Sequence, residues 1–467
     1  MMLIIVVLTP VILLLFSMRA SDRRIRLSEA FKEIHEKRYY LHALGYLVII
    51  NWKYLTDQLN EPIKHRTGHW TDWIYAIEGD FTKWIQDAFY NDLLTEVLNF
   101  HYLFIYLFLI YVTTVFYAYV GERDLTDKVA LNYLLIYALA VPYYLFFNVE
   151  VTSSWIPGME ALLYHDGWYT VFYASHDPLD NAVPSLHVAI PFGILMINWL
   201  HCREKNIKMK DWDFYHYHLF ILANTVLFCF AILYLGIHWF VDIPLGMLVG
   251  GIGALFIHHL QPRLRNDHGG WFEGVDFPKV RKHLVVEGVV ALVLGAVIMG
   301  AVTYQESIAD EQVSFRLGPE DSTFDIIQEL KYDEPMTMEV TNLAKHDLEV
   351  ILLVVEATVP AMDDGFIDWE KLKEIGEMVT IPADSTRTFS VSQPLVYHVL
   401  VMHNPDTENI QEVRIVTDYG KDVMWQAILM SIASLWMTGF VVHRLIRLKM
   451  AGRSLIDSTP SHLWEEE

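Results

Sequence analysis

Long apolar stretches separated by polar loops dominate the pattern of hydrophobic and polar positions along this chain. A stretch of about 17 to 25 apolar residues is long enough to cross a lipid bilayer as a helix. The chain holds nine such blocks, at residues 3–18, 39–55, 98–120, 129–147, 183–200, 219–238, 239–260, 284–303 and 423–445. The pattern therefore predicts an all-α polytopic membrane protein with nine transmembrane helices.

Residues 304–422 follow a different pattern, in which apolar and polar residues alternate over short runs. Alternation with a period of two is typical of half-buried strands, and Pro and Asn-Pro turns break the runs. The runs lie at 336–341, 348–354, 386–391, 397–402 and 413–417, and one short helix is expected at 368–378. We interpret this stretch as a β-sandwich inserted between the last two membrane helices.

The placement of basic residues predicts how the chain crosses the membrane. The segments 19–38, 203–210 and 263–282 hold seven, four and five Lys or Arg residues, and further basic residues follow the last block. With nine helices, all these segments lie on the side that the positive-inside rule assigns to the cytoplasm. The first block lacks the leading basic residues of a signal peptide, which favours an anchor. We therefore predict a multi-pass plasma-membrane protein with its N-terminus outside and its C-terminus in the cytoplasm.

These patterns together divide the chain into five predicted parts. They are an anchor helix with a basic cytoplasmic loop (1–38), a six-helix membrane core (39–262), a cytoplasmic loop with the eighth helix (263–303), an extracytoplasmic β domain (304–422), and a last helix with a cytoplasmic tail (423–467).

The charge balance of the chain excludes one class of partner. The net charge is −23, and residues 304–422, with 25 acidic and 8 basic residues, account for −17 of it. A nucleic-acid surface needs clustered Lys and Arg, so we expect no nucleic-acid partner. Cys202 and Cys229 lack Cys-x-x-Cys spacing, which argues against a thiolate metal site and a disulfide framework.

Two short polar motifs are predicted at the same outer side of the membrane. In the first, Pro184 suits the first turn of a helix, so Ser185 and His187 are expected at a helix N-terminus, where free N–H groups and the helix dipole attract anions. In the second, His238 is expected to open the seventh helix, which places Asp242 one turn on and on the same face.

These residue types suit phosphoryl transfer. A carboxylate beside His238 would orient the imidazole and leave its other nitrogen free as a nucleophile. His187 would then protonate the leaving group. The polar residues of either motif alone are more often ordinary residues at a membrane interface. Both motifs are predicted at the same membrane depth on the outer side, and this coincidence favours an active site. Nearby, Gly246, Gly250, Gly251 and Gly253 predict close helix packing that brings His238 toward His187.

The order Pro184-Ser185-Leu186-His187, followed about fifty residues later by His238 and Asp242, resembles the type 2 phosphatidic acid phosphatase superfamily. The residues around both motifs are most similar to its inositol-phosphorylceramide-synthase-like branch. The resemblance covers about half the chain and implies a six-helix core. The resemblance implies that His238 forms a phosphohistidine with Asp242 as its partner. It also implies that His187 acts as acid and then base, that Ser185 holds a phosphate oxygen, and that no metal or other cofactor is needed.

The chain lacks basic residues that the motifs of the superfamily usually contain. No Lys or Arg occurs between residues 129 and 202, and Ile232 stands where the third motif has an Arg six residues before the catalytic His. Phosphoryl transfer relies on positive groups around the equatorial oxygens. We hypothesise that this charge comes from one of four residues, although each also has an ordinary interfacial or loop interpretation: Lys64, Arg66, His165 and His176.

The predicted function is therefore a membrane lipid phosphate phosphatase or phosphotransferase that acts at the outer face on a lipid phosphate or diphosphate. The sequence leaves hydrolysis and head-group transfer open. An alternative is a catalytically inactive relative that binds an envelope partner through residues 304–422, since the usual cations are missing. A soluble vanadate-dependent haloperoxidase, which shares the anion site, is disfavoured by the membrane helices.

Overall fold

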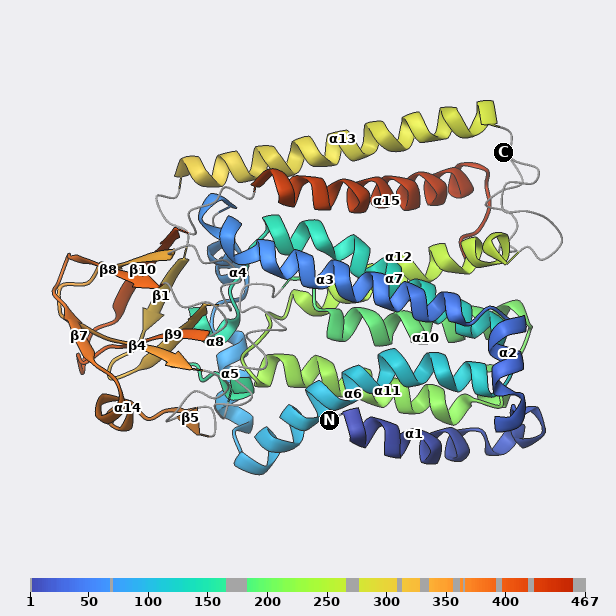
Figure 1. Ribbon diagram of the computed structural model, residues 1–467, viewed down its shortest axis with the longest axis horizontal. Coiled ribbons are helices and arrows are strands. Elements are labelled where there is room, and N and C mark those ends of the chain that lie inside the picture. The colour runs from blue at the N-terminus through green and yellow to red at the C-terminus, as the bar shows by residue number, and fades with distance from the viewer. Residues whose placement is uncertain are drawn as a thin grey trace.

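The computed structural model describes residues 2–67, 70–164, 183–265, 277–308, 313–327, 336–355, 362–363, 366–391, 397–418 and 424–456. A long helical bundle carries a separate, smaller β region at one of its ends (Figure 1). Below, this end is called the β-domain end, and the opposite end, where the loop with α2 (Ala30–Glu36) lies, is called the far end.

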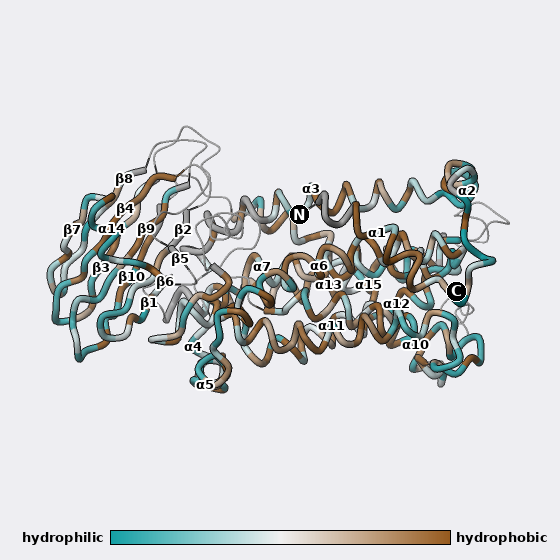
Figure 2. Tube along the Cα trace, turned by 90° about the horizontal axis from the view of Figure 1, so that it is seen from below, coloured by the Kyte–Doolittle hydropathy of each residue, from teal (hydrophilic) through white to brown (hydrophobic). Residues whose placement is uncertain are grey.

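Six helices in the described part of the chain are long and apolar enough to cross a membrane. They cover Asp92–Tyr119 (α6), Arg123–Phe146 (α7), Tyr215–Tyr234 (α11), Asp242–Pro262 within α12 (Asp242–Leu264), Val280–Tyr304 within α13 (Phe277–Ile308) and Met424–Met450 (α15). The protein is therefore a multi-pass, mostly helical membrane protein, as predicted. Figure 2 shows that hydrophobic residues predominate along these helices.

The other three predicted spans also form helices, but within the described residues these helices are not both long enough and apolar enough to count as candidate membrane spans. These helices are α1 (Met2–Phe16), α3 (Tyr40–Thr67) and α10 (Leu186–Glu204). The 15 residues of α1 extend over about 22 Å, which is less than the hydrocarbon thickness of about 30 Å. The count of nine spans stays a prediction. Some boundaries were wrong. We expected an outer loop directly after residue 55, but α3 continues to Thr67, and α13 continues to Ile308, past the predicted end of the eighth span at residue 303.

The tightest contact in the bundle joins α10 to α12, because glycine lets their backbones meet. A Cβ atom on Gly246 would lie 2.7 Å from the carbonyl oxygen of Ser185, and one on Gly250 would overlap the carbonyl oxygen of Ala189. On the same helix, a Cβ atom on Gly253 would lie 2.5 Å from the Asn132 side chain of α7. Small residues at an interface allow such close approach in membranes. The predicted packing role of this glycine face agrees with these contacts.

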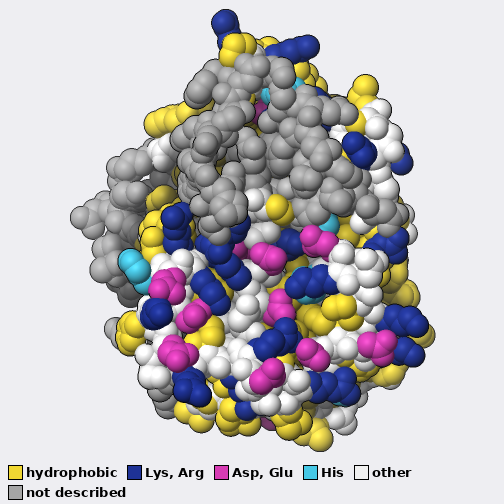
Figure 3. Space-filling view, turned by 90° about the vertical axis from the view of Figure 1, so that its right-hand side faces the viewer, with side chains coloured by type: hydrophobic (Ala, Val, Ile, Leu, Met, Phe, Trp, Pro, Cys, Tyr) yellow, Lys and Arg dark blue, Asp and Glu magenta, His cyan; other side chains and the backbone are white. Residues whose placement is uncertain are grey.

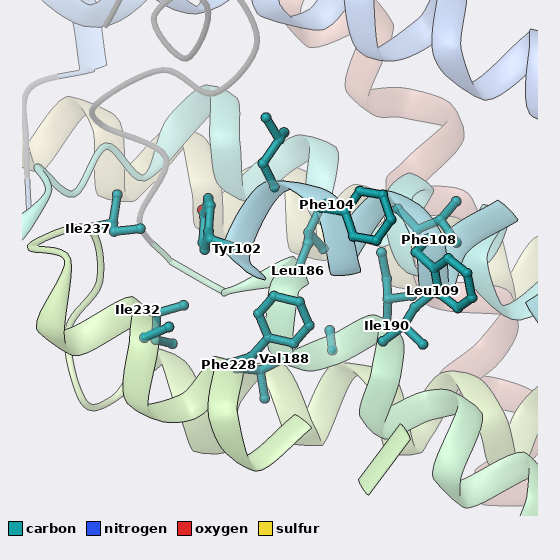
Figure 4. Packing of buried hydrophobic residues seen from close by; sticks show 14 of the residues in the cluster. Tyr102, Phe104, Phe108, Leu109, Leu186, Val188, Ile190, Phe228, Ile232 and Ile237 are labelled. Atoms are coloured by element: carbon teal, nitrogen blue, oxygen red, sulfur yellow. The ribbon is translucent and has the colours of Figure 1, made fainter. Parts of the chain in front are cut away.

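Aromatic and aliphatic side chains from α6, α10 and α11 fill the bundle around the start of α10. Figure 4 shows this packing, in which Tyr102, Leu186 and Phe228 come from the three different helices. In contrast, α13 presents apolar side chains outward: Leu292 is 75% exposed and Val297 is 62% exposed. An exposed apolar helix face of this kind suits contact with lipid tails.

The β region consists mainly of two four-stranded antiparallel sheets with the orders β1-β10-β3-β8 and β2-β9-β4-β7. The strands are β1 (Val313–Leu317), β2 (Ser322–Ile327), β3 (Met336–Asn342), β4 (Leu348–Val355), β5 (Met362–Asp363), β6 (Phe366–Ile367), β7 (Met378–Ile381), β8 (Thr386–Val391), β9 (Tyr397–His403) and β10 (Gln411–Asp418). Buried side chains of both sheets, such as Val340 and Val350, share one core, as in a sandwich. The predicted short helix is present as α14 (Trp369–Ile375). We call this region the β domain.

Two short helices, α4 (Thr71–Glu78) and α5 (Phe81–Phe89), lie across the β-domain end of the bundle (Figure 1). They are separated at Gly79, which has a φ of +55°, a conformation that glycine adopts without strain. The segment with α8 (Thr152–Trp155) joins this end to the β domain: the backbone N–H of Gly158 donates to Asp321 Oδ2 at 3.2 Å.

Candidate active site

The structure brings Ser185, His187, His238 and Asp242 together at the β-domain end of the bundle. Ser185 is the N-cap residue of α10 and His187 lies in its first turn. Asp242 is the first residue of α12. Two local expectations were wrong. Pro184 precedes the N-cap and is not in the first turn of the helix, and His238 lies in the turn before α12, so it does not open that helix.

A chain of hydrogen bonds links three of these side chains. His238 Nδ1 lies 3.0 Å from Asp242 Oδ2, and His238 Nε2 lies 3.3 Å from Ser185 Oγ. The same carboxylate oxygen accepts the backbone N–H of Trp239 at 2.9 Å, which fixes the carboxylate relative to the turn. The proximity that an i, i+4 helical spacing predicted is therefore achieved through a turn. Because Asp242 faces Nδ1, Nε2 is the ring nitrogen that points toward Ser185.

Ser185 does not use its hydroxyl to cap α10. Its backbone carbonyl accepts the N–H of Ala189 at 3.0 Å, but its side chain makes no capping hydrogen bond and instead approaches His238. The first N–H groups of a helix lack intrahelical partners, and the positive end of the helix dipole adds to their attraction for anions. The start of α10 can therefore present a hydroxyl and backbone N–H groups to one phosphate group.

His187 is held between two tyrosine rings of α6. The ring centroids of Tyr102 and Tyr106 both lie 3.9 Å from the His187 ring, at interplanar angles of 21° and 33°. The His187 and His238 rings are 6.4 Å apart, centroid to centroid. Two imidazoles that are distant in the sequence therefore lie close enough for one phosphate group to contact both.

Several residues that support this arrangement were not expected from the sequence. Tyr102 and Tyr106 have the i, i+4 spacing of one helix face, but that signal is common among buried aromatic residues. Gln86 of α5 accepts the N–H of Glu160 at 2.8 Å and donates to the carbonyl of Tyr234 at 3.0 Å, four residues before His238. No local motif in the sequence identifies Gln86.

Burial also changes the acidity of carboxyl groups near this end. Burial raises the pKa of Glu78 in α4, while hydrogen bonds from the backbone of Val241 and Phe240 oppose the change. The pKa of Glu160 rises to about 7, first because of burial and then because Asp321 lies nearby. Both groups lie outside the six candidate membrane helices.

The proposed substitutes for the missing cations remain predictions. Lys64 and Arg66 belong to the last turns of α3 and not to a loop, and their side chains lie outside the described part of the structure. His165 and His176 also lie outside the described residues. Among the described side chains, no Lys or Arg forms an ion pair with Asp242. The described His, Cys, Asp and Glu residues form no group arranged to hold a metal ion.

One comparison with known proteins gives a match. Residues 156–266 match the family model described as the PAP2 superfamily. The match confirms the predicted resemblance to the type 2 phosphatidic acid phosphatase superfamily, and it contains both motifs, although it spans α10 to α12 and not all six helices of the predicted core. The inositol-phosphorylceramide-synthase-like branch stays a prediction. No curated protein and no solved structure matches the chain.

Proposed function

We propose that this chain, whose residues 156–266 carry a PAP2 superfamily domain, is a membrane enzyme that removes or transfers the phosphate of a lipid phosphate or diphosphate. The observation that carries the proposal is the Ser185–His238–Asp242 hydrogen-bonded chain with His187 beside it. It provides a nucleophile, a group that orients the nucleophile, a phosphate-binding hydroxyl and a second imidazole for proton transfer.

In the first step, His238 Nε2 attacks phosphorus and the bond from phosphorus to the leaving oxygen breaks. Asp242 keeps the proton of His238 on Nδ1 and stabilises the positive ring that forms, as the 3.0 Å contact allows. His187 donates a proton to the leaving oxygen, a role worth about 10²- to 10⁴-fold in rate. The products are a phosphohistidine and a free lipid alcohol or lipid phosphate.

In the second step, His187 removes a proton from an incoming oxygen, which attacks phosphorus and breaks the bond to Nε2. Water gives hydrolysis, and an alcohol gives head-group transfer. Ser185 and the first N–H groups of α10 hold phosphate oxygens through both steps. The scheme uses no metal or other cofactor.

The placement of charge supports action at the outer face. Figure 3 shows that Lys and Arg side chains are spread over the far end of the bundle, together with Asp and Glu. A basic far end belongs in the cytoplasm by the positive-inside rule, which puts the site and the β domain outside. In this orientation the C-terminal tail lies in the cytoplasm, while the N-terminus outside and the plasma membrane as the location stay predictions, since α1 begins partway along the bundle (Figure 1).

Exposed aromatic residues beside the site suit a lipid substrate. Trp73 of α4 is 55% exposed and Trp84 of α5 is 62% exposed. Tryptophan is enriched where a membrane meets water, so these two helices are placed to lie at the membrane surface next to Asp242. A lipid head group that lies at this depth reaches the imidazoles without leaving the membrane.

The proposal is tested by trapping the intermediate. The purified protein is mixed with a panel of ³²P-labelled lipid monophosphates and diphosphates, quenched, and examined for label that is lost in acid and stable in alkali. We expect such label in the wild type and none in His238→Ala. His216→Ala, which removes an exposed histidine at the far end, is the matched control and should retain the label.

The same experiment separates the proposed enzyme from an inactive binding protein. Retention of label in His238→Ala excludes the assigned nucleophile. Absence of label and of turnover in the wild type across the panel favours the alternative, in which the chain acts as a membrane-anchored binder through its β domain.

A further inference from the structure

The turn that carries His238 leaves two backbone donors without a local partner. His238 N–H donates to the carbonyl of Ile232, and Trp239 N–H donates to Asp242. Three further N–H groups donate to backbone carbonyls of the same turn: that of Asp242 to Trp239, that of Ile243 to Phe240, and that of Leu245 to Val241. Pro244 has no N–H group. Phe240 and Val241 supply the two donors that remain.

Glu78 of α4 accepts both of these donors. Its Oε2 lies 2.7 Å from Phe240 N, and its Oε1 lies 2.5 Å from Val241 N. Glu78 is separated from this turn by more than 160 residues of sequence, so the contact exists through the tertiary fold alone. A carboxylate that accepts backbone N–H groups just before a helix also interacts favourably with the helix dipole.

Aromatic contacts on both sides reinforce the same junction. The ring of Tyr75, one helical turn before Glu78, lies 6.2 Å from the Trp239 ring in an edge-to-face arrangement. Phe81, at the start of α5, lies 5.6 Å from the Phe240 ring, also edge to face. Tyr75, Glu78 and Phe81 therefore hold consecutive residues of the turn between His238 and Asp242.

We infer that Glu78 is a positioning residue for the proposed catalytic pair, because its carboxylate holds the turn that sets His238 against Asp242 and Ser185. The inference rests on the proposed function and adds to it a residue that lies outside the matched segment 156–266. Glu78 does not touch the reacting atoms. It acts by restricting the backbone of residues 240 and 241, and through them the direction of the His238 ring.

This role predicts a selective loss of turnover. A Gln at position 78 has the same shape but keeps one acceptor oxygen, and its NH₂ group faces a backbone donor. A misplacement of about 1 Å in a catalytic group can cost about 10²-fold in rate. For Glu78→Gln we therefore expect kcat to fall by about 10- to 100-fold with KM nearly unchanged, since substrate contacts are retained. Glu78→Asp keeps both oxygens on a shorter side chain and should recover part of the loss.

The experiment compares wild type, Glu78→Gln, Glu78→Asp and Asp72→Asn in detergent micelles. Asp72 is an exposed acidic residue on the same helix and serves as the matched control. Turnover is measured with phosphatidic acid in mixed micelles. In parallel, ¹³C-labelled histidine signals are recorded, and the His238 signal is identified by its loss in His238→Ala.

We expect reduced kcat and a shifted His238 signal in Glu78→Gln, partial recovery of both in Glu78→Asp, and wild-type behaviour in Asp72→Asn. Unchanged kcat with an unchanged His238 signal overturns the inference, and so does a change confined to KM. If Glu78→Gln does not fold, Glu78→Asp decides by the same two measurements. If the wild type turns over neither phosphatidic acid nor any other lipid of the labelled panel, the proposed function fails, and the His238 signal still decides whether Glu78 positions this ring.

Discussion

The two ends of the membrane bundle treat buried polar residues differently. At the far end, each buried carboxylate pairs with a guanidinium group as well as an imidazole. Asp127 Oδ1 is 3.0 Å from Arg265 Nη2 and 2.8 Å from His42 Nε2, and Glu287 Oε1 is 3.5 Å from Arg444 Nε and 3.3 Å from His443 Nδ1. At the β-domain end, buried Asp242 faces an imidazole and a backbone N–H, and no Lys or Arg among the described side chains pairs with it. Ion pairs compensate charge and hold helices together, whereas an imidazole can change its bonds and its proton during a reaction. Under the proposed function, the guanidinium pairs of the far end serve stability and the β-domain end serves chemistry.

The sharpest way to break this comparison is Asp242→Asn. Asp242 Oδ2 contacts both His238 Nδ1 and the Trp239 N–H. If the Asn carbonyl takes that position, both contacts remain, but the negative charge that stabilises the positive ring is lost. If the NH₂ group takes it, two N–H donors face each other and the ring proton moves to Nε2, which blocks the nucleophile. We expect a loss of turnover of about 10⁴-fold, by analogy with the effect of such a change on an Asp–His pair, and little change in the unfolding temperature. Asp211→Asn, an exposed change at the far end, is the control. Wild-type turnover in Asp242→Asn would contradict the assigned role.

The opposite result is expected at the far end for Arg265→Met. Asp127 loses its guanidinium partner and keeps His42, whose Nε2 lies 2.8 Å from Oδ1. Removing one partner of a buried ion pair costs about 3 kcal/mol or more of stability, so the unfolding temperature should fall while turnover of the folded protein stays the same. Arg316→Met breaks an exposed pair with Glu412 and should cost about 1 kcal/mol at most. A loss of turnover without a loss of stability in Arg265→Met would contradict the division between the two ends.

A smaller effect is expected where helix packing places Ser185. In Gly246→Ala the new methyl group would meet the Ser185 carbonyl at 2.7 Å, so α10 must shift relative to α12. We expect a loss of about 1 to 3 kcal/mol in stability from the added volume. The same shift moves Ser185 from His238 and should lower turnover by about tenfold, which corresponds to about 1.4 kcal/mol.

Gly251→Ala is the matched control for that prediction. A Cβ atom there lies 3.4 Å from a ring carbon of Phe192, and that side chain can adjust. Turnover and thermal unfolding are measured for both variants. Equal turnover in the two variants would show that the spacing of α10 and α12 does not set the site.

The smallest effect concerns the pH dependence of stability at the rim of the site. The pKa of Glu160 rises from an ordinary 4.5 to about 7 in the folded protein, first because of burial. The folded state therefore binds this proton more tightly than the unfolded state, so its contribution to stability is greatest at low pH and is lost as pH rises from about 4.5 to 7. The unfolding temperature of the wild type should fall relative to that of Glu160→Gln between pH 5 and pH 8. If the unfolding temperatures of the two proteins change with pH in the same way, the raised pKa of Glu160 is contradicted.

Most of the helices and several strands could be predicted from the sequence because each depends on a local pattern. The strand Thr386–Val391 occurs where alternation predicted it, while β1 and β2 lie in the same predicted β domain but were not among the predicted runs. The four motif residues were also found locally. The two tyrosines around His187 and the carboxylate of Glu78 were not, because their roles depend on contacts between distant segments.

The sequence by itself determined that this chain crosses a membrane several times, that an acidic β domain is inserted before the last helix, and that two histidine motifs stand near helix starts. Apolar length, alternation and motif spacing are properties of neighbouring residues, and they survive in any arrangement of the helices. The tertiary structure decided that α10 and α12 touch at Gly246, which sets Ser185 against His238, and that α4 holds the turn through Glu78. These outcomes depend on how surfaces from distant segments fit together, and no local pattern contains that information.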